Sequence, residues 1–390
     1  MLRGGQTPPA ADREPGITAA RDLVPFRSMN TPLPIVDVSG GPHEMGTSYG
    51  AQAAELIRAN VDAYLERFER AVSLDRAAVI AQGALFGETT RAHFPRLGVM
   101  LDATAVAAEV EPELIYAINA RSELLYGSPT CGTPQECTAI GVLDSRAANG
   151  HTLLAQNWDW HPDQLPYTLL LITRDEKGHE VATLTEAGML AKSGLNNKGL
   201  GVCVNLIGSD RDGSPGGVPY HVLLRSVLEA DSLSWASRYA LRAPRSASIN
   251  LLIGQSHEDG GELLDLELCP GDAGWLHPQD GILVHANHFE SNVPIYDTIK
   301  DWGGSSLFRS ARARRLLGQG EVKPEDLLGV LKDHHGAPLA ICRHLDERDA
   351  EADRSQTIWT VMMDLDERSI QLIPGPPCED GKALVLKPFN

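Results

Sequence analysis

The residues best suited to chemistry are a cysteine, an amide and a carboxylate that lie within one short stretch. Cys137, Asn157 and Asp159 belong to the segment CTAIGVLDSRAANGHTLLAQNWD. A thiolate is a good nucleophile, but a free thiol has a pKa of about 8.5 and needs a neighbouring base at neutral pH. A carboxylate can hold such a base in place, and an amide N–H can stabilise a developing oxyanion. These are the groups that a cysteine enzyme uses for acyl transfer.

The elements that position these residues are two predicted strands. CTAIGVL is rich in small, β-branched and apolar residues, DSRAANG contains the turn signal Asn149-Gly150, and HTLLAQNWD reads as the second strand. Such a hairpin brings Cys137 and Asp159 towards one end of a sheet, and Asn157 with them. The alternative for Cys137 alone is a small buried apolar residue, which is the common state of an isolated cysteine.

The stretch resembles the nucleophile segment of the penicillin acyltransferase-like enzymes, which are cysteine N-terminal-nucleophile (Ntn) hydrolases. In that family the cysteine of a Cys-Thr pair, here Cys137-Thr138, becomes the first residue of the mature β chain by self-cleavage. The resemblance places the cut between Glu136 and Cys137, although the fungal enzyme has glycine at the position of Glu136. An α-amine has a pKa of about 7.7–8.0, so the new chain end could serve as the base. Asp159 would hold its ammonium form.

Further residues match the family along most of the chain. The resemblance implies that Asn250, within the strand RSASINLLIG, donates to the oxyanion, with Asn205 and Asn157 as alternatives. It also implies that Arg309, in a Ser-x-x-Arg pattern that begins at Ser306, lies beside the nucleophile. Structural alternatives stay open, because an asparagine can cap a turn and a helix with several arginines is mostly solvated.

Composition limits the class of protein. The 390 residues are 42% hydrophobic and carry a formal net charge of −18, which disfavours a nucleic-acid or anionic-membrane surface. The six cysteines show no CxxC pair and no zinc spacing, so we expect no disulfide framework. No signal core and no apolar run of membrane-spanning length is present, which favours a cytoplasmic enzyme.

The order of predicted elements indicates an α+β fold. Helices occupy the segment from about 41 to 126, and pairs of strands with intervening helices follow. The family sharpens this expectation to the four-layer αββα sandwich of Ntn hydrolases, cut into two chains. We expect a flexible extension over residues 1–30, an α chain over 31–136 and a β chain over 137–390.

Two histidine groups could suggest a metal instead. His285 and His288 form one, and Asp333, His334 and His335 form the other, but neither supplies a third ligand at helical spacing. We therefore expect no metal and no cofactor. A metallohydrolase that uses these histidines stays a third alternative.

The expected function is hydrolysis of a small N-acyl compound through a thioester on Cys137. Acyl-CoA-dependent N-acylation is the alternative within the same chemistry, with acyl-CoA as a substrate, although no phosphate-cradling loop is evident. An alternative from another class is a non-catalytic binding scaffold that is never cleaved. The expected partners are the small-molecule substrate and the two chains themselves, and homo-oligomer formation stays open.

Overall fold

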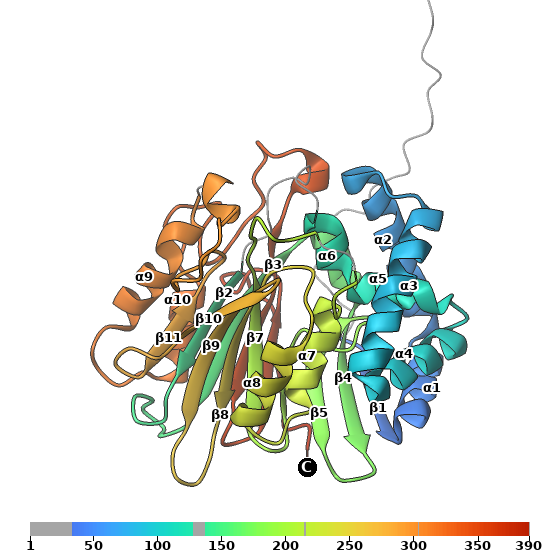
Figure 1. Cartoon of the computed structure of the whole chain (residues 1–390). Coiled ribbons are helices and arrows are strands. Elements are labelled where there is room, and N and C mark those ends of the chain that lie inside the picture. Colours follow the sequence, from blue (N-terminus) through green and yellow to red (C-terminus); the bar gives the residue numbers. More distant parts are fainter. Residues whose placement is uncertain (1–32, 128–136, 214–215, 303, 390) are drawn as a thin grey trace, which may run out of the picture. The chain divides into compact units, whose positions relative to one another are not determined.

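Two β-sheets form the core of the computed structural model, which describes residues 33–127, 137–213, 216–302 and 304–389. The larger sheet has eight strands in the order β1-β4-β5-β6-β7-β8-β9-β10, and the smaller has six in the order β11-β2-β3-β12-β13-β14 (Figure 1). Strands β2 and β3 contact β7, and β2 also contacts β8, so the two sheets pack face to face. The predicted α+β class is confirmed.

The bounds of the elements are as follows. The strands are β1 (Ile35–Gly40), β2 (Cys137–Val142), β3 (Leu153–Trp160), β4 (Thr168–Asp175), β5 (Glu180–Glu186), β6 (Ser193–Asn196), β7 (Leu200–Leu206), β8 (Ile249–Gln255), β9 (Glu262–Cys269), β10 (Asp272–Leu276), β11 (Ile282–His285), β12 (Gln356–Asp364), β13 (Ser369–Pro374) and β14 (Leu384–Leu386). The α-helices are α1 (Pro42–Gln52), α2 (Ala54–Val72), α3 (Arg76–His93), α4 (Pro95–Ala108), α5 (Pro112–Asn119), α6 (Arg121–Tyr126), α7 (Tyr220–Leu228), α8 (Leu233–Arg242), α9 (Ser306–Leu317) and α10 (Pro324–Leu331). Short 3₁₀ turns occupy Pro162–Tyr167, Ile299–Trp302 and Glu351–Asp353.

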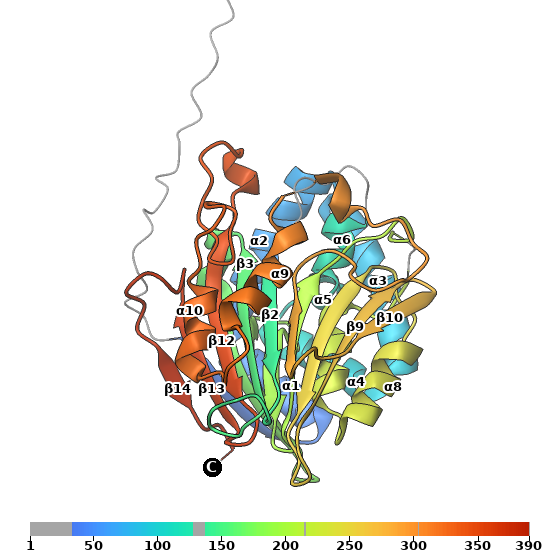
Figure 2. The same cartoon turned by 90° about the vertical axis from the view of Figure 1, so that its left-hand side faces the viewer.

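Helices cover the outer faces of both sheets. Helix α9 contacts β11 and helix α10 contacts β3 on the six-stranded sheet, and Figure 2 shows both helices lying over it. Helix α7 contacts β6 and β7 of the eight-stranded sheet, and α8 contacts β8. An apolar cluster joins α9 and α10 to the outer face of β2 and β3; it includes Ile140, Ala155, Leu317 and Leu331. The helices therefore fix the orientation of the hairpin.

The predicted hairpin is the pair β2 and β3. Cys137 pairs with Trp158, and Thr138 pairs with Asn157. Because side chains alternate along a strand, Cys137 and Trp158 share the face towards the other sheet, and Thr138 and Asn157 share the opposite face. Every residue of both strands is buried, as expected for strands covered on both sides.

The helical segment predicted from about residue 41 begins with two helices, α1 and α2, which are divided at Ala53. Helix α1 packs closely on α4, because Gly46 and Gly50 lie against the backbone carbonyl oxygens of Met100 and Thr104. A β-carbon at either glycine would collide with that backbone. The two glycines therefore allow α1 and α4 to pack closely.

Hydrogen bonds to the turn around Gly188 attach the N-terminal helices to the sheet. Tyr49 donates its hydroxyl to the carbonyl of Met189, and Asn60 donates to the carbonyl of Ala187. Asn119 donates to the carbonyl of Gly188 at 2.9 Å and accepts from the N–H of Leu190. Side chains from three helices thus hold one turn after β5.

Residues 33–390 form one compact unit by their contacts. The predicted extension over residues 1–30 and the connector that contains Glu136 lie outside the described residues. No helix in the described part of the chain is long and apolar enough to cross a membrane.

Candidate active site

The first residue of β2 is the centre of the candidate site. Cys137 is 3% exposed, and its thiol faces the eight-stranded sheet. Its backbone N–H donates to Oδ1 of Asn287 at 2.7 Å. Its carbonyl accepts from Nδ2 of Asn205 at 3.1 Å and from the guanidinium of Arg309. Three side chains from distant parts of the sequence therefore hold both ends of this one residue.

Helix α9 supplies the cation of this arrangement. Nη2 of Arg309 donates to Oδ1 of Asn287 at 2.8 Å, and Nη1 donates to the hydroxyl of Thr138 at 2.6 Å. The hydroxyl of Ser306 accepts from the N–H of Asn287 at 2.9 Å. Both residues of the Ser-x-x-Arg pattern thus position Asn287 and the backbone of Cys137, and they do so from the outer side of the six-stranded sheet.

Asp159 flanks the same end of β2. It follows Trp158, the partner of Cys137, and therefore lies beside the N-terminal end of that strand. Its Oδ1 accepts from the hydroxyl of Thr357 at 2.6 Å, and that hydroxyl in turn accepts from the N–H of Arg343. The Asp159 carboxylate raises the pKa of the Cys137 thiol, and a hydrogen bond from the backbone N–H of Asp159 to that thiol lowers the pKa by less. Asp159 is fully buried, so its carboxylate is held by the fold.

The thiol itself lies in an aromatic and cationic environment. Nζ of Lys192 is 5.1 Å from the ring centre of Trp158 and 5.7 Å from that of Tyr220. Burial raises the pKa of the Cys137 thiol in the uncut chain, and the Lys192 ammonium lowers it in part. Burial also lowers the pKa of Lys192 to about 8, because a charged amine is poorly solvated there. Lys192 is thus the strongest cationic influence on the thiol.

Asn250 lies directly opposite Asn205 in the register of β7 and β8, so both amides project from one face of the sheet. The two amides differ in their partners. Nδ2 of Asn205 donates to two carbonyls, those of Cys137 and His285. Among the described residues Nδ2 of Asn250 donates only to Asp265, which leaves its second N–H. Asn250 is therefore the amide better able to donate to a substrate oxygen.

A buried ionic network supports Asn250 from β9 and β11. Nε2 of His285 lies 2.7 Å from Oε1 of Glu267 and 4.0 Å from Oδ1 of Asp265. Burial alone would lower the pKa of His285, but Asp265 and Glu267 outweigh it and raise it to about 9. Burial raises the pKa of Asp265 to about 7, although His285 acts against this. The cationic His285 is therefore paired most directly with the Glu267 carboxylate.

One candidate named from the sequence lies away from the thiol. Nδ2 of Asn157 donates to the carbonyls of Leu331 and Ile341, and its Oδ1 accepts from Thr360. These contacts lie on the outer face of the six-stranded sheet, where the alternation of side chains directs Asn157. The expectation that Asn157 converges with the thiol, as a pocket or oxyanion residue, was therefore wrong. Thr138 lies on that same outer face.

Two further residues were missed by the sequence analysis. Asn287 lies in HANHF, a segment that drew attention only for its histidines. Lys192 is the lone charge in the run GMLAKSGL, and it is 5% exposed. A lysine within an apolar run is rarely buried, so this isolation was a usable signal.

The histidine groups that could have indicated a metal have different partners. His285 bonds Glu267, and His288 lies 3.0 Å from the hydroxyl of Ser306. Asp333 is engaged by the guanidinium of Arg312. His334, in contrast, lies 3.2 Å from His344, in a group considered below.

The fold and site define a class of protein: an α+β protein of two packed sheets, with a buried cysteine at the start of a central strand and polar side chains that hold its backbone. The chain belongs to the acyl-coenzyme A:6-aminopenicillanic acid acyl-transferase family, whose model matches residues 145–378. A relative from Emericella nidulans, described as the 40 kDa form of acyl-coenzyme A:6-aminopenicillanic-acid-acyltransferase, is 26% identical over 354 residues, which are 90% of this chain and 95% of that one. The family resemblance drawn from the sequence is confirmed.

Solved structures also show similarity. Penicillin V acylase from Agrobacterium tumefaciens has a TM-score of 0.42 and 14% identity, over 64% of this chain and 86% of that one. A mutant conjugated bile acid hydrolase from Clostridium perfringens has a TM-score of 0.42 and 12% identity, over 64% of this chain and 92% of that one.

Proposed function

We propose that the protein is a self-cleaving cysteine Ntn hydrolase that acts on small N-acyl compounds through a thioester on Cys137. Cleavage between Glu136 and Cys137 would give an α chain of residues 1–136 and a β chain of 137–390. The reaction that we favour is amide hydrolysis.

The observation that carries this proposal is that side chains hydrogen-bond both the backbone nitrogen and the carbonyl oxygen of Cys137. Its nitrogen faces Oδ1 of Asn287 at 2.7 Å, and its carbonyl accepts from Asn205 and Arg309. These are contacts from side chains, and the thiol does not take part in them. An acceptor beside the nitrogen suits an ammonium group even better than a peptide N–H, because the bond becomes charge-assisted. This arrangement supports a nitrogen that becomes a chain end.

Self-cleavage needs no group beyond those of the chain and one water. The Cys137 sulfur would attack the carbonyl of Glu136, a C–S bond would form, and the C–N bond would break. The thiol proton would pass to the leaving nitrogen, which becomes the α-amine. Water would then hydrolyse the thioester and restore the thiol, leaving a free carboxylate on Glu136.

Turnover would repeat the same chemistry on a substrate. The α-amine accepts the thiol proton, the sulfur attacks the acyl carbonyl, and the amine returns the proton to the leaving group. Asn250 donates to the oxyanion through its second N–H, and Asp159 holds the ammonium form of the chain end. Loss of one oxyanion donor typically costs about 10²–10³ in rate, so Asn250→Ala should reduce turnover by roughly that factor.

Acyl transfer from acyl-CoA to an amine is the alternative within the same site. It is favoured by the name of the Emericella nidulans relative, which specifies an acyl-coenzyme A donor and 6-aminopenicillanic acid as acceptor. Both reactions pass through the Cys137 thioester, but they differ in the acyl donor, an N-acyl compound or an acyl-CoA, and in whether water or an amine accepts the acyl group. The two are therefore distinguished by donor and product and not by the intermediate.

The test is intact-mass analysis of the purified protein before and after exposure to a mixture of N-acyl amines and acyl-CoAs, quenched in acid. We expect two fragments that divide at Cys137, and an acyl adduct on the β chain alone. Cys137→Ala should remain one chain and carry no adduct. Cys269→Ala, which removes a buried free cysteine outside the site, should behave like the unchanged protein.

Two results would contradict the proposal. A single uncut chain that takes no adduct and resists iodoacetamide would indicate the non-catalytic scaffold. Full turnover by Cys137→Ala would place the chemistry elsewhere.

A further inference from the structure

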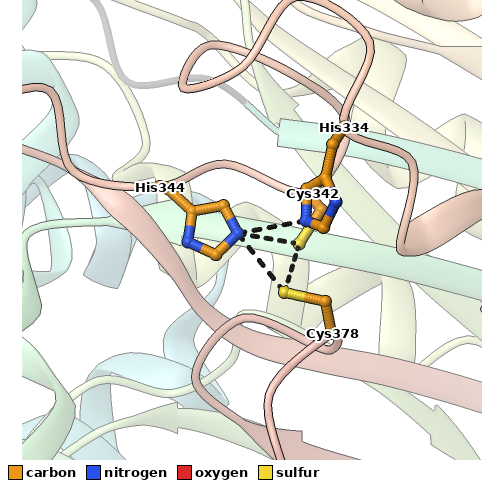
Figure 3. A group of neighbouring side chains, drawn as sticks. All are labelled: His334, Cys342, His344 and Cys378. Atoms are coloured by element: carbon orange, nitrogen blue, oxygen red, sulfur yellow. Dashed lines mark hydrogen bonds between the residues drawn. The ribbon is translucent and has the colours of Figure 1, made fainter.

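Four metal-ligating side chains meet at a place distinct from the Cys137 thiol. His334 follows α10, Cys342 and His344 lie in the connection to β12, and Cys378 follows β13. Their ligand atoms all lie within 4.8 Å of one another. Figure 3 shows the two sulfur atoms and the imidazole nitrogens pointing towards a common centre.

Four of the six separations are close to the edges of a small tetrahedron, and the two between His334 and the sulfur atoms are within 4.8 Å. The two Nε2 atoms of His334 and His344 are 3.2 Å apart, and the sulfurs of Cys342 and Cys378 are 3.6 Å apart. Nε2 of His344 lies 3.6 Å from the Cys342 sulfur and 3.3 Å from the Cys378 sulfur. Zinc bonds of about 2.0–2.1 Å to nitrogen and about 2.3 Å to sulfur give tetrahedral edges of roughly 3.3 Å and 3.8 Å. The cluster therefore has nearly the size that a zinc ion requires.

We propose that this cluster is a structural zinc site with two cysteine and two histidine ligands. Two thiolates and two imidazoles at tetrahedral spacing suit Zn²⁺ better than Mg²⁺ or Ca²⁺, which prefer oxygen ligands. All four positions are filled by protein, so no place remains for a water or a substrate, and the ion is structural rather than catalytic. Binding requires that both thiols lose their protons, so affinity falls as the pH falls.

A carboxylate lies on the outer side of one ligand. Nδ1 of His344 is 3.9 Å from Oε1 of Glu379, the residue after Cys378. Histidines that bind a metal through one nitrogen commonly direct the other towards a carboxylate, which fixes the ring and strengthens the ligand. His334 is exposed, which gives the ion a path from solvent.

The site would join two segments that are distant in the sequence. The segment that carries Cys342 and His344 leads into β12, and Cys378 ends the turn after β13. The N–H of Cys342 already bonds the carbonyl of Asp333, and the N–H of His344 bonds that of Pro338. A bound ion would link the connection before β12 to the turn after β13. It would thereby stabilise an irregular part of the fold that has few regular hydrogen bonds.

A disulfide between Cys342 and Cys378 is the competing arrangement. The sulfurs are 3.6 Å apart, whereas a disulfide bond is about 2.05 Å long. A disulfide would also give the two histidines no shared role. We therefore favour the ion.

The test is metal analysis of the full chain, purified without chelator, by mass spectrometry. We expect about one zinc ion per chain. The double variant Cys342→Ser/Cys378→Ser should lose it, and His344→Ala should lose most of it. His335→Ala and Cys269→Ser are matched controls, because each removes a side chain of the same type outside the cluster, and both should keep the ion.

A second measurement does not depend on the folding of variants. The unchanged protein is stripped with a chelator and titrated with Co²⁺. A tetrahedral site with thiolate ligands gives intense visible absorption and a thiolate-to-cobalt charge-transfer band, both of which Zn²⁺ should abolish. Absence of metal in the purified protein together with absence of these bands would overturn the proposal. So would iron as the bound metal, or an intact mass that lacks two hydrogens and shows a Cys342–Cys378 disulfide.

Discussion

At the scale of single residues, the thiol of Cys137 depends on a lysine that the sequence did not single out. The Lys192 ammonium lies over the rings of Trp158 and Tyr220, inside a site where a charged amine is poorly solvated. Burying such a cation is costly, and its charge lowers the pKa of the Cys137 thiol against the larger effect of burial.

Replacement of Lys192 by methionine should slow alkylation of Cys137 by iodoacetamide several-fold at pH 7, because loss of the cation raises the pKa of the thiol further. The pKa of Lys192 is about 8, since burial lowers it. Below that pH the cation is present and the difference between the two proteins should be largest, and above it the difference should shrink. The measurement is the alkylation rate against pH, followed by mass on the peptide that contains Cys137.

Lys192→Arg is the matched control, since it keeps a charge of the same sign. It should retain faster alkylation than Lys192→Met both below and above pH 8, because guanidinium stays protonated there. Equal rates for the lysine and methionine forms across the whole range would show that the cation does not act on the thiol.

Local pattern and the family resemblance together predicted part of this site. Cys137, Asn205 and Arg309 were named from the sequence, and the structure brings them together at one carbonyl. Asn157 was misplaced because closeness in sequence was given more weight than the two-residue alternation of a strand. Asn287 was missed because its contact with Cys137 spans 150 positions, and no local pattern reports such a distance.

At the scale of elements, the helices of the N-terminal part depend on close backbone approach. Gly46 of α1 faces the carbonyl of Met100 in α4, and an added methyl group would collide with it. Gly329 of α10 has nothing within 4 Å of the corresponding position and is exposed. The two glycines lie in the same kind of element but in opposite surroundings.

Gly46→Ala should therefore destabilise the protein by about 1–3 kcal/mol, as overpacking of a close contact does. Gly329→Ala should stabilise it by about 0.4–1 kcal/mol, because alanine reduces the entropy of the unfolded chain and meets no obstacle. The check is urea unfolding followed by circular dichroism. Equal shifts of both variants in the same direction would show that helix propensity, and not packing against α4, decides the effect.

Element type was more predictable than element bounds. The hairpin, the pairs of strands and the intervening helices lie where period and turn signals placed them. The break at Ala53 was missed, since the apolar spacing continues across it. Helix α10 and strands β10 and β14 were also missed. They have 8, 5 and 3 residues, so periodicity has little length in which to show.

At the scale of the whole molecule, the segments before and after Cys137 share one core. Strand β1 pairs in parallel with β4, and Ile35 lies opposite Leu170. The hydroxyl of Tyr64 bonds Glu186 at 2.5 Å, and Arg121 forms a buried ion pair with the same carboxylate at 3.0 Å. These contacts cross the proposed cut, so the cut removes one peptide bond and leaves the packing in place.

The α and β chains, once formed, should therefore remain together in gel filtration and separate only in denaturant. They should also unfold in one transition, because neither segment retains its core without the other. The measurement is size-exclusion chromatography with gel analysis of each fraction, with and without urea. Elution of the two fragments in separate peaks under native conditions would contradict the shared core.

Long-range assembly is what the sequence could not provide. His334, Cys342 and His344 lie in the connection between α10 and β12, and Cys378 lies after β13, so the four do not have the spacing of a known zinc motif. The sequence shows each of these residues, but it does not show that they lie close together. Their proximity depends on how the connection before β12 packs against the turn after β13.

The acceptor beside the Cys137 nitrogen has one more consequence. Asn287, braced by Arg309, already occupies its place while the peptide bond is intact. On the proposed pathway the precursor thus already holds Asn287 and Arg309 in their final positions. Maturation then breaks a covalent bond and needs no rearrangement of these side chains. Such a preorganised molecule should mature by a first-order process within each copy, at a rate that dilution leaves untouched.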